Sequence, residues 1–163
     1  KVNTMSNGPS VNAPLGLSRP VHDIRVTNRT GSTVALGRLM QLDFVSLGSE
    51  ATDNNEGHVL SGLANGIAVT ADAMAGLQIV VVALEDIADD ASGSCRVYGR
   101  VKAMGSATVD ISSVGAALTV TATELGGHAS DGKGIYAIAL GDTANDTLSE
   151  VLWNGFGWAN ASA

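Results

Sequence analysis

Apolar and polar residues alternate with a period of two along several short stretches of this chain, which is typical of β-strands that bury one face. The alternation is clearest at residues 96–102, where valine and glycine alternate with arginine, tyrosine and lysine, and at residues 118–123, where leucine, valine and alanine alternate with threonine. We expect the charged and hydroxyl side chains of each stretch to face solvent and the apolar side chains to face a core.

Stretches with β character recur along most of the chain, at residues 22–28, 33–47, 59–63, 66–71, 77–84, 94–103, 108–111, 117–124, 134–140 and 148–154. Turn-rich segments dense in Asp, Asn, Ser and Gly separate some of them, as at residues 86–93 and 141–146. Helical patterning is scarce, since only residues 70–75 and 112–117 suit one or two helical turns. Short strands at this spacing predict an all-β fold, a single compact β-sandwich or barrel with little helix.

Glycine is abundant, with 20 residues against three prolines and no Gly-X-Y period, which argues against collagen and indicates many turns and bulges. In residues 25–43, two β-compatible runs flank Thr30-Gly31-Ser32, and Gly37 interrupts the second run. We expect a bulge or a tight bend at Gly37.

The first 21 residues lack apolar periodicity and are rich in Asn, Ser, Gly and Pro. We therefore divide the chain into an extended N-terminal arm, residues 1–21, and a β-sandwich or barrel body, residues 22–163. The apolar residues of the arm are spaced for a peptide that lies along a partner, and a disordered tail is the alternative interpretation. The candidate contact residues of the arm are Val11, Leu15, Leu17, Arg19 and Val21.

The 163 residues are 45% hydrophobic and carry a formal charge of −7, which is unevenly distributed. Residues 1–29 have four basic side chains against one Asp, whereas residues 30–163 have five basic and 15 acidic side chains. An acidic body repels phosphate backbones, so we expect no nucleic-acid binding by the body. A basic arm is suited to docking on an acidic protein surface.

The longest apolar run, residues 79–84, is far shorter than the roughly 20 residues that span a bilayer, and no apolar signal core is present at the N-terminus. We expect a soluble protein with no membrane partner. The single cysteine, Cys95, cannot form an internal disulfide and lies in a strand-like run. We expect it to be a buried hydrophobic residue rather than a reactive thiol.

The search for catalytic, cofactor-binding and metal-binding residues leads us to assign none. Residues 127–134 approach the phosphate-binding Gly-x4-Gly-Lys-Ser/Thr loop but end on Gly134, and the following residues suit a strand, so we expect a glycine-rich hairpin loop. The three histidines have no metal-site spacing, and the acids of residues 85–90 lack the order of an EF-hand loop. No Ser has a His and a carboxylate placed beside it in a known motif. We expect a protein that is not an enzyme, and the sequon at residues 28–30 is taken as a chance match.

Three of the six aromatic residues lie close to the C-terminus, namely Trp153, Phe156 and Trp158. One interpretation is that the last strand closes the core with these side chains. The other is that they anchor a second subunit or a partner, because Trp and other large aromatic residues dominate interface hot spots.

A succession of motifs resembles the small head decoration, or capsid cement, proteins of tailed bacteriophages. The motifs span residues 22–156 and are Val26-Thr-Asn-Arg-Thr-Gly31, Val34-Ala-Leu-Gly37, Val97-Tyr-Gly-Arg-Val101, Val114-Gly-Ala-Ala-Leu-Thr-Val120, Gly134-Ile-Tyr-Ala-Ile-Ala-Leu140 and Val151-Leu-Trp-Asn-Gly155. The acidic residues 46–58 and the Trp-rich C-terminal segment depart from the family pattern.

This resemblance implies a non-enzymatic virion protein on the outer surface of an icosahedral head, often a homotrimer, whose arm reaches over neighbouring subunits of the major capsid protein. We accordingly expect the arm residues to contact capsid protein, and apolar strand faces or Trp153, Phe156 and Trp158 to join subunits, with no cofactor. The alternative is a carbohydrate- or cell-surface-binding module, such as a spike or fibre head, whose acidic loops hold Ca²⁺. A virion-associated hydrolase is the third candidate, and it ranks below the other two because no catalytic motif supports it.

Overall fold

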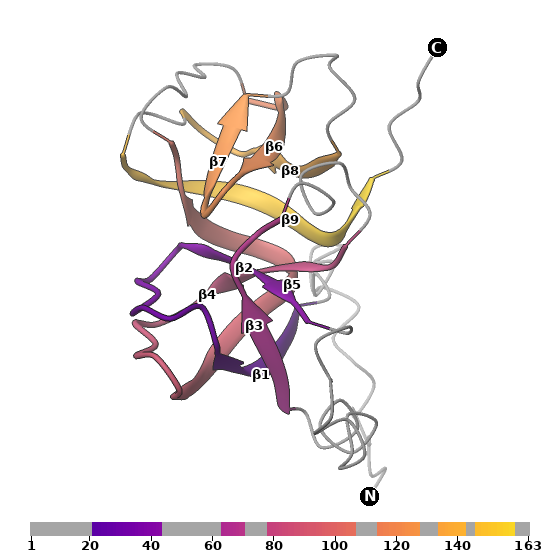
Figure 1. Ribbon diagram of the computed structural model, residues 1–163. Helices are drawn as coiled ribbons and strands as arrows, with labels where there is room; N and C mark the ends of the chain where they lie inside the picture. Colours follow the sequence, from indigo (N-terminus) through magenta and orange to yellow (C-terminus); the bar gives the residue numbers. More distant parts are fainter. Residues whose placement is uncertain are drawn as a thin grey trace, which may run out of the picture.

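The computed structural model describes residues 21–43, 63–70, 78–106, 114–127, 134–142 and 146–158. Within these ranges the chain forms nine strands and no helix (Figure 1), so the predicted all-β class is confirmed. The strands are β1 (His22–Asn28), β2 (Leu39–Leu42), β3 (Leu63–Ile67), β4 (Val80–Ala83), β5 (Ser92–Met104), β6 (Ala117–Thr121), β7 (Glu124–Gly127), β8 (Ile135–Ala139) and β9 (Leu148–Trp158).

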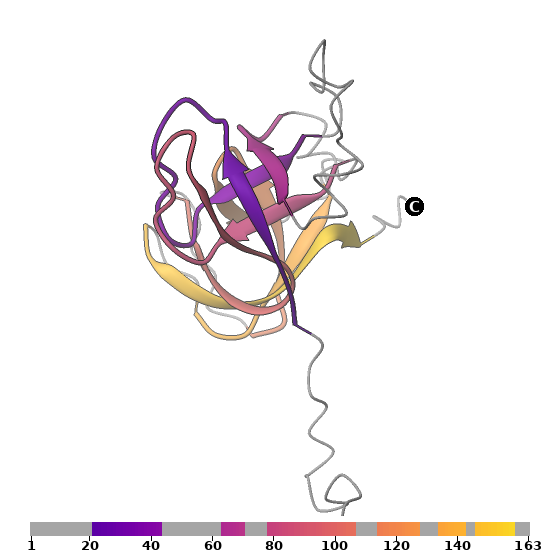
Figure 2. The same ribbon diagram turned by 90° about the horizontal axis from the view of Figure 1, so that it is seen from below.

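The first five strands form a closed barrel in the order β1-β3-β2-β4-β5, because β1 also pairs with β5. The β1–β3 pair is parallel, and the other pairs of the barrel are antiparallel. In Figure 2, β1 (indigo) runs along the near side of the barrel as one of its wall strands, where it pairs with β5. Closure gives each of these strands a partner on both sides, which removes the exposed edges that invite aggregation.

The long strand β5 connects this barrel to a second layer of strands. From Tyr98 onward β5 pairs with β9, and the sheet then continues through β8 and β6 to β7. Figure 1 shows β6, β7 and β8 on the opposite side of β9 from the barrel. β7 returns to the end of β5, where the Ser106 amide donates to the Leu125 carbonyl at 2.8 Å. The second layer thus curls back onto the strand from which it starts.

Two hydrophobic cores follow from this arrangement. One fills the barrel and contains Val26, Val34, Met40, Leu42, Val81, Ala83, Ile87, Cys95 and Val97. The other lies between the barrel wall and the second layer and contains Leu39, Val80, Val82, Val101, Ala103, Leu118, Val120, Leu125, Tyr136, Ala137, Ala139, Val151 and Trp153. Alternate residues of β2 and β4 enter different cores, so both strands are buried on both faces. That position explains why their sequences are mostly apolar and lack alternation.

The structure divides one predicted strand and joins two others. Residues 117–124 were expected to form one strand, but Ala122 and Thr123 make a two-residue turn between β6 and β7, and Ala122 has a φ of 50°. Conversely, β3 runs from the end of the strand predicted at residues 59–63 into the start of the one predicted at 66–71, and residues 68–70 are not in a strand. Residues 59–62 and 71 lie outside the described ranges. A period-two pattern continues through a two-residue turn without a break, so it could not locate this one.

The predicted exposure of the threonines in residues 118–123 is wrong for Thr119, which is fully buried. Its hydroxyl donates to the Gly134 carbonyl at 2.8 Å, and this hydrogen bond replaces the one it would make with water. In β5 the predicted alternation is confirmed, since residues 95, 97, 99, 101 and 103 are buried and the residues between them are not.

Other expectations have mixed outcomes. Of the strand predicted at 33–47, residues 39–42 form a strand, the other described residues (33–38 and 43) do not, and residues 44–47 lie outside the described ranges. Gly37 adopts a φ of 81°, which confirms the tight bend. Residues 114–117 form a turn and the start of β6 rather than a helical turn, and residues 108–111 lie outside the described ranges. The described ranges contain no helix long and apolar enough to cross a bilayer.

Candidate functional site: an interaction surface beside the arm

The predicted arm joins the body at the first residue of β1. Of its candidate contact residues, Val11, Leu15, Leu17 and Arg19 lie outside the described residues, and Val21 is 51% exposed. His22 pairs with Tyr98 of β5, and Tyr98 also pairs with Asn154 of β9. His22 of β1 and Asn154 of β9 therefore lie on either side of Tyr98, two strand spacings or about 10 Å apart.

Beyond Asn154, the end of β9 carries an exposed aromatic side chain, because Phe156 is 59% exposed. The Asn154 side chain holds this segment by donating to the Gly157 carbonyl at 2.9 Å and accepting from the Phe156 amide at 3.3 Å. Gly157 adopts a φ of 72°, a conformation that favours glycine. Trp158 follows, partly buried, in register with Ile135 of β8. Phe156 is thus presented to solvent near the point where the arm leaves the body.

Trp153 occupies a different environment from Phe156 and Trp158. It is fully buried, its ring stacks on Tyr136 with centroids 5.8 Å apart, and its indole N–H donates to the Val80 carbonyl at 3.3 Å. A side chain packed inside the molecule cannot reach another subunit, so the assignment of Trp153 to a subunit contact is wrong. Phe156 and Trp158 stay predictions for such a contact.

The outward face of β1, β5 and the adjoining part of β9 carries most of the described positive charge. We call it the basic face; its charged residues are Asp23, Arg25, Arg96, Arg100, Lys102 and Glu150. Two ion pairs cross it, Arg96 with Asp23 at 2.5 Å and Arg100 with Glu150. Sequence alternation predicted an outward row at residues 96–102, but only strand pairing shows that β1 and β9 extend it.

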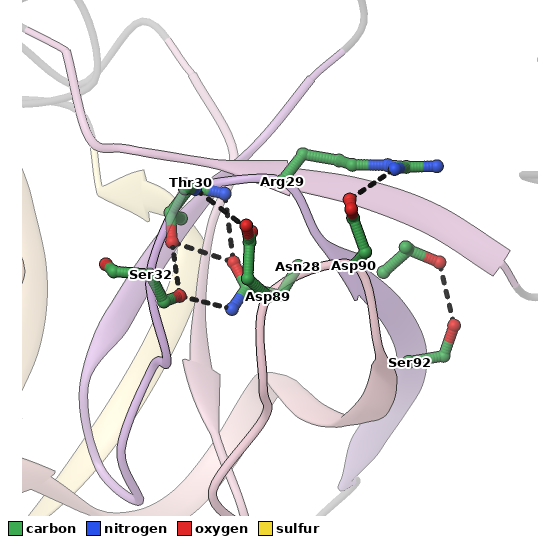
Figure 3. Close-up of polar contacts among 9 residues, drawn as sticks. Asn28, Arg29, Thr30, Ser32, Asp89, Asp90 and Ser92 are labelled. Carbon is green, nitrogen blue, oxygen red and sulfur yellow. Dashed lines mark hydrogen bonds and ion pairs between the residues drawn. The ribbon is translucent and has the colours of Figure 1, made fainter.

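The loops at the start of β5 are held together by a polar network around Asn28 (Figure 3). The buried Asn28 side chain donates to the carbonyls of Ser32 and Ile87 at 2.7 and 2.9 Å. Its oxygen accepts from the Thr30 amide and hydroxyl at 2.9 and 2.8 Å. The amide therefore uses all of its hydrogen-bonding groups inside the protein, and the sequon residue Asn28 is inaccessible to a glycosylating enzyme in the folded chain.

The acidic residues at 85–90 have structural partners in this network. Glu85 accepts from the Ser94 amide at 2.7 Å, and Asp86 accepts from the Leu36 amide at 2.7 Å. Asp89 accepts from the Gly31 amide, and Asp90 pairs with Arg29. Asp86, Asp89 and Asp90 thus join the loop at 84–91 to the loop at 29–38, and Glu85 joins it to β5. Within the described ranges, no cluster of three or more His, Cys, Asp or Glu is arranged for a metal ion.

A half-open hollow of about 380 Å³ lies beside the same loops. Its lining includes Thr30, Ser32, Thr33, Val34, Ala35, Arg38, Ala68 and Thr123. Arg38 forms an ion pair with Glu124, which joins the first loop to the turn between β6 and β7. The hydroxyl groups and this ion pair offer both donors and acceptors to a small polar ligand.

Neither of the two groups with a shifted pKa is arranged for catalysis. Burial raises the pKa of the Cys95 thiol to about 12, with smaller contributions from Glu85 and Asp23, so the thiolate needed for nucleophilic attack is suppressed. Its predicted burial is confirmed, since Cys95 is fully inaccessible. Burial also raises the pKa of Tyr136 to about 12.

The segment that resembled a phosphate-binding loop joins β7 to β8, and its residues 128–133 lie outside the described ranges. A strand follows Gly134, as predicted, in place of the helix that a phosphate-binding loop requires. The expectation of a hairpin is wrong, because β7 and β8 each pair with β6 and lie on opposite sides of it.

Comparison with known proteins identifies a likeness in fold. No protein-family model matches the chain. No curated protein matches it either. Among solved structures, the chain is similar to the crystal structure of the head fiber gp8.5 N base in bacteriophage phi29. The alignment has a TM-score of 0.53 and 15% identity, and it covers 85% of this chain and 100% of that chain. The all-β architecture described above is thus one that is also found at the base of a phage head fiber.

Proposed function

We propose that this chain is a non-enzymatic structural protein of a phage virion, which binds the outside of the assembled icosahedral head and stabilises its lattice. The observation that carries the proposal is the fold shared with a phage head fiber base over 85% of the chain. The predicted arm, which leaves the body beside the exposed Phe156, supports it.

Stabilisation follows from preferential binding to one state of the shell. A protein that binds the assembled lattice but not free subunits favours assembly by mass action, by about 2.7 kcal/mol per site at a concentration 100 times Kd. Many copies add their separate effects across one shell. If one copy also contacts several capsid subunits, its contacts act multivalently, so modest affinity at each is sufficient. Ordering of the arm on binding opposes affinity and adds selectivity for the correct lattice geometry.

The test is co-sedimentation of the purified protein with expanded heads that lack it, with unexpanded proheads and with dissociated major capsid protein. We expect saturable binding to expanded heads alone. Deletion of residues 1–21 is expected to leave a folded body that no longer binds. Full affinity without the arm would overturn the arm assignment, and no binding to any of the three would overturn the proposal.

We also propose a homotrimer, with Phe156 and Trp158 in the contact between subunits. Multi-angle light scattering of the full chain measures the mass directly, and the trimer is three times the 16.4 kDa of one chain. A monomeric mass at every concentration that supports head binding would remove the trimer from the proposal and leave the head-binding function intact.

A carbohydrate-binding module is the second candidate, and the hollow beside Ser32, Thr33 and Thr123 favours it, because hydroxyl and charged groups suit a polyhydroxylated ligand. A glycan array with the wild type and a Thr33→Val variant tests this function. A signal lost on substitution would support it, and a signal lost in EDTA would indicate assistance by Ca²⁺. An array without any signal would reject it.

A further inference from the structure

We infer that the basic face lies against the partner, and that the partner surface it contacts is an acidic protein surface. This inference rests on the proposed function and adds the orientation of the body to it. β1 pairs with β5 from Ser92 to Tyr98. The arm joins β1 at the Tyr98 end of this pairing, and the polar network around Asn28 lies at the Ser92 end, which follows the loop at 84–91.

Charge is segregated on the body. The basic face holds four of the six Lys and Arg side chains of the described residues, against two of their ten Asp and Glu side chains, which gives it a net charge of +2. The other described residues carry two basic and eight acidic side chains, a net charge of −6. A complementary partner of this face is therefore acidic, since potentials of opposite sign guide association and fix orientation.

The excess charge on the basic face comes from two residues. Arg96 and Arg100 are compensated by their ion pairs with carboxylates on the same face. Among the described residues, exposed Arg25 donates to the Ser92 carbonyl at 3.0 Å, and neither it nor exposed Lys102 forms an ion pair. Neither cation therefore has an ion pair with a described residue to break when it meets carboxylates of a partner.

The basic face also has the composition of a protein-binding surface. Tyr98 and Leu152, both partly exposed, lie among its charged residues. An apolar and aromatic centre within a charged rim is typical of protein–protein interfaces. A nucleic acid is a poorer fit, because a net charge of +2 on this face neutralises few phosphates.

The predicted arm joins the body at this face. His22, the first residue of β1, pairs with Tyr98, and the charged residues of the arm, Lys1 and Arg19, are both basic. A partner that binds the arm is therefore brought against the basic face with the same sign of charge presented to it. An isologous contact between two copies through this face is disfavoured, since it would place two positive surfaces together.

The experiment compares a charge reversal on this face with one elsewhere. The double variant Arg25→Glu/Lys102→Glu reverses the uncompensated cations. The control is Arg29→Glu, which reverses an exposed cation outside the basic face and is matched by the single variant Lys102→Glu. A second pair, Arg25→Gln/Lys102→Gln, removes the charge without adding carboxylates. Urea unfolding establishes that each variant folds before its binding is measured.

We expect the Glu double variant to lose at least about tenfold in affinity for expanded heads in 50 mM NaCl and the Gln variant to lose less, because only the former adds repulsion. The affinity of the control is expected to change by less than about threefold, and the affinity of the wild type is expected to fall as salt rises. Equal losses of affinity in the variant and the control, or no loss in either, would overturn the inference. Binding of the wild type to expanded heads would still uphold the proposed function in that case.

If the wild type does not bind heads, the proposed function fails, and the basic face is tested separately by NMR titration with a polyglutamate peptide and with a duplex oligonucleotide. Shifts at Arg25 and residues 96–102 with the peptide, absent in the Glu variant, would support an acidic protein partner. Shifts confined to other residues, or tighter binding of the duplex, would overturn it.

Discussion

Trp153 and Tyr136 stack with their ring centroids 5.8 Å apart and their planes at 21°, and both side chains are fully buried. The indole N–H reaches the Val80 carbonyl, and the phenol donates to the Gln78 carbonyl at 2.7 Å. The two largest side chains of the second core are thereby bonded to Gln78 and Val80, at the start of β4. This pair therefore ties the second layer to the wall of the barrel.

Trp153→Ala is expected to lower the free energy of unfolding by about 3–5 kcal/mol, because it leaves a large cavity and an unpaired carbonyl. Phe156→Ala, three residues along the same strand, is expected to change it by less than about 0.5 kcal/mol, because that side chain is exposed. Urea denaturation of both variants makes the comparison. Similar losses in the two would contradict the assignment of Trp153 to the core and Phe156 to the surface.

Asn28→Ala is expected to cost about 2–3 kcal/mol of stability, since the Ser32 and Ile87 carbonyls and the Thr30 amide lose their partner at a buried position. Thr33→Ala in the same loop is the matched control and is expected to be nearly neutral, because Thr33 is exposed. Thermal unfolding followed by circular dichroism measures both. A neutral Asn28 variant would show that water takes over these hydrogen bonds.

Gly155 lies where the backbones of β4, β5 and β9 meet. A Cβ at this position would lie 2.3 Å from the Val80 carbonyl oxygen and 2.8 Å from that of Val97, so Gly155→Ala is expected to destabilise the fold by about 1–3 kcal/mol. Gly141→Ala is the control, because a Cβ there meets nothing within 4 Å. Equal midpoints of urea unfolding in the two variants would show that the backbone around Gly155 leaves room for a methyl group, contrary to these distances.

Cys95 is expected to resist alkylation by iodoacetamide at pH 8 in the folded protein and to react once urea unfolds it, because burial raises its pKa to about 12 and blocks access. Rapid labelling that does not require unfolding would contradict this burial. Mass spectrometry after a timed reaction measures the modified fraction.

The same raised pKa predicts a loss of stability in alkali. Between pH 9.0, the ordinary pKa of the thiol, and about pH 12, the thiol loses its proton in the unfolded chain but keeps it in the folded one. Its contribution to stability is therefore complete below pH 9.0 and decreases by about 1.4 kcal/mol per pH unit as pH rises toward 12. Cys95→Ala removes this slope, so we expect the stabilities of wild type and variant to converge from pH 9.0 to pH 11. Tyr136 titrates in both and cancels in the comparison. Parallel pH profiles would contradict the shift.

Much of the fold was predictable because strand periodicity is a local property of the backbone. The residues 22–28 agree with β1 at both ends, and the alternation of residues 96–102 correctly divided exposed from buried side chains. The turn at Ala122 and Thr123 was missed because its residues continue the period-two pattern. The burial of Thr119 was missed because its partner, the Gly134 carbonyl, is distant in sequence.

The order of residues in the chain was sufficient to predict that it forms β-strands, that its core is mostly aliphatic, and that basic residues gather toward its N-terminus. Contacts between distant parts of the chain were needed to show that β1 closes a barrel on β5, that His22 and Asn154 lie on either side of Tyr98, and that Trp153 is buried while Phe156 is exposed. The physical reason is that periodicity sets which face of a strand is apolar, whereas the choice of strand partner depends on hydrogen bonds and packing between residues far apart in the chain.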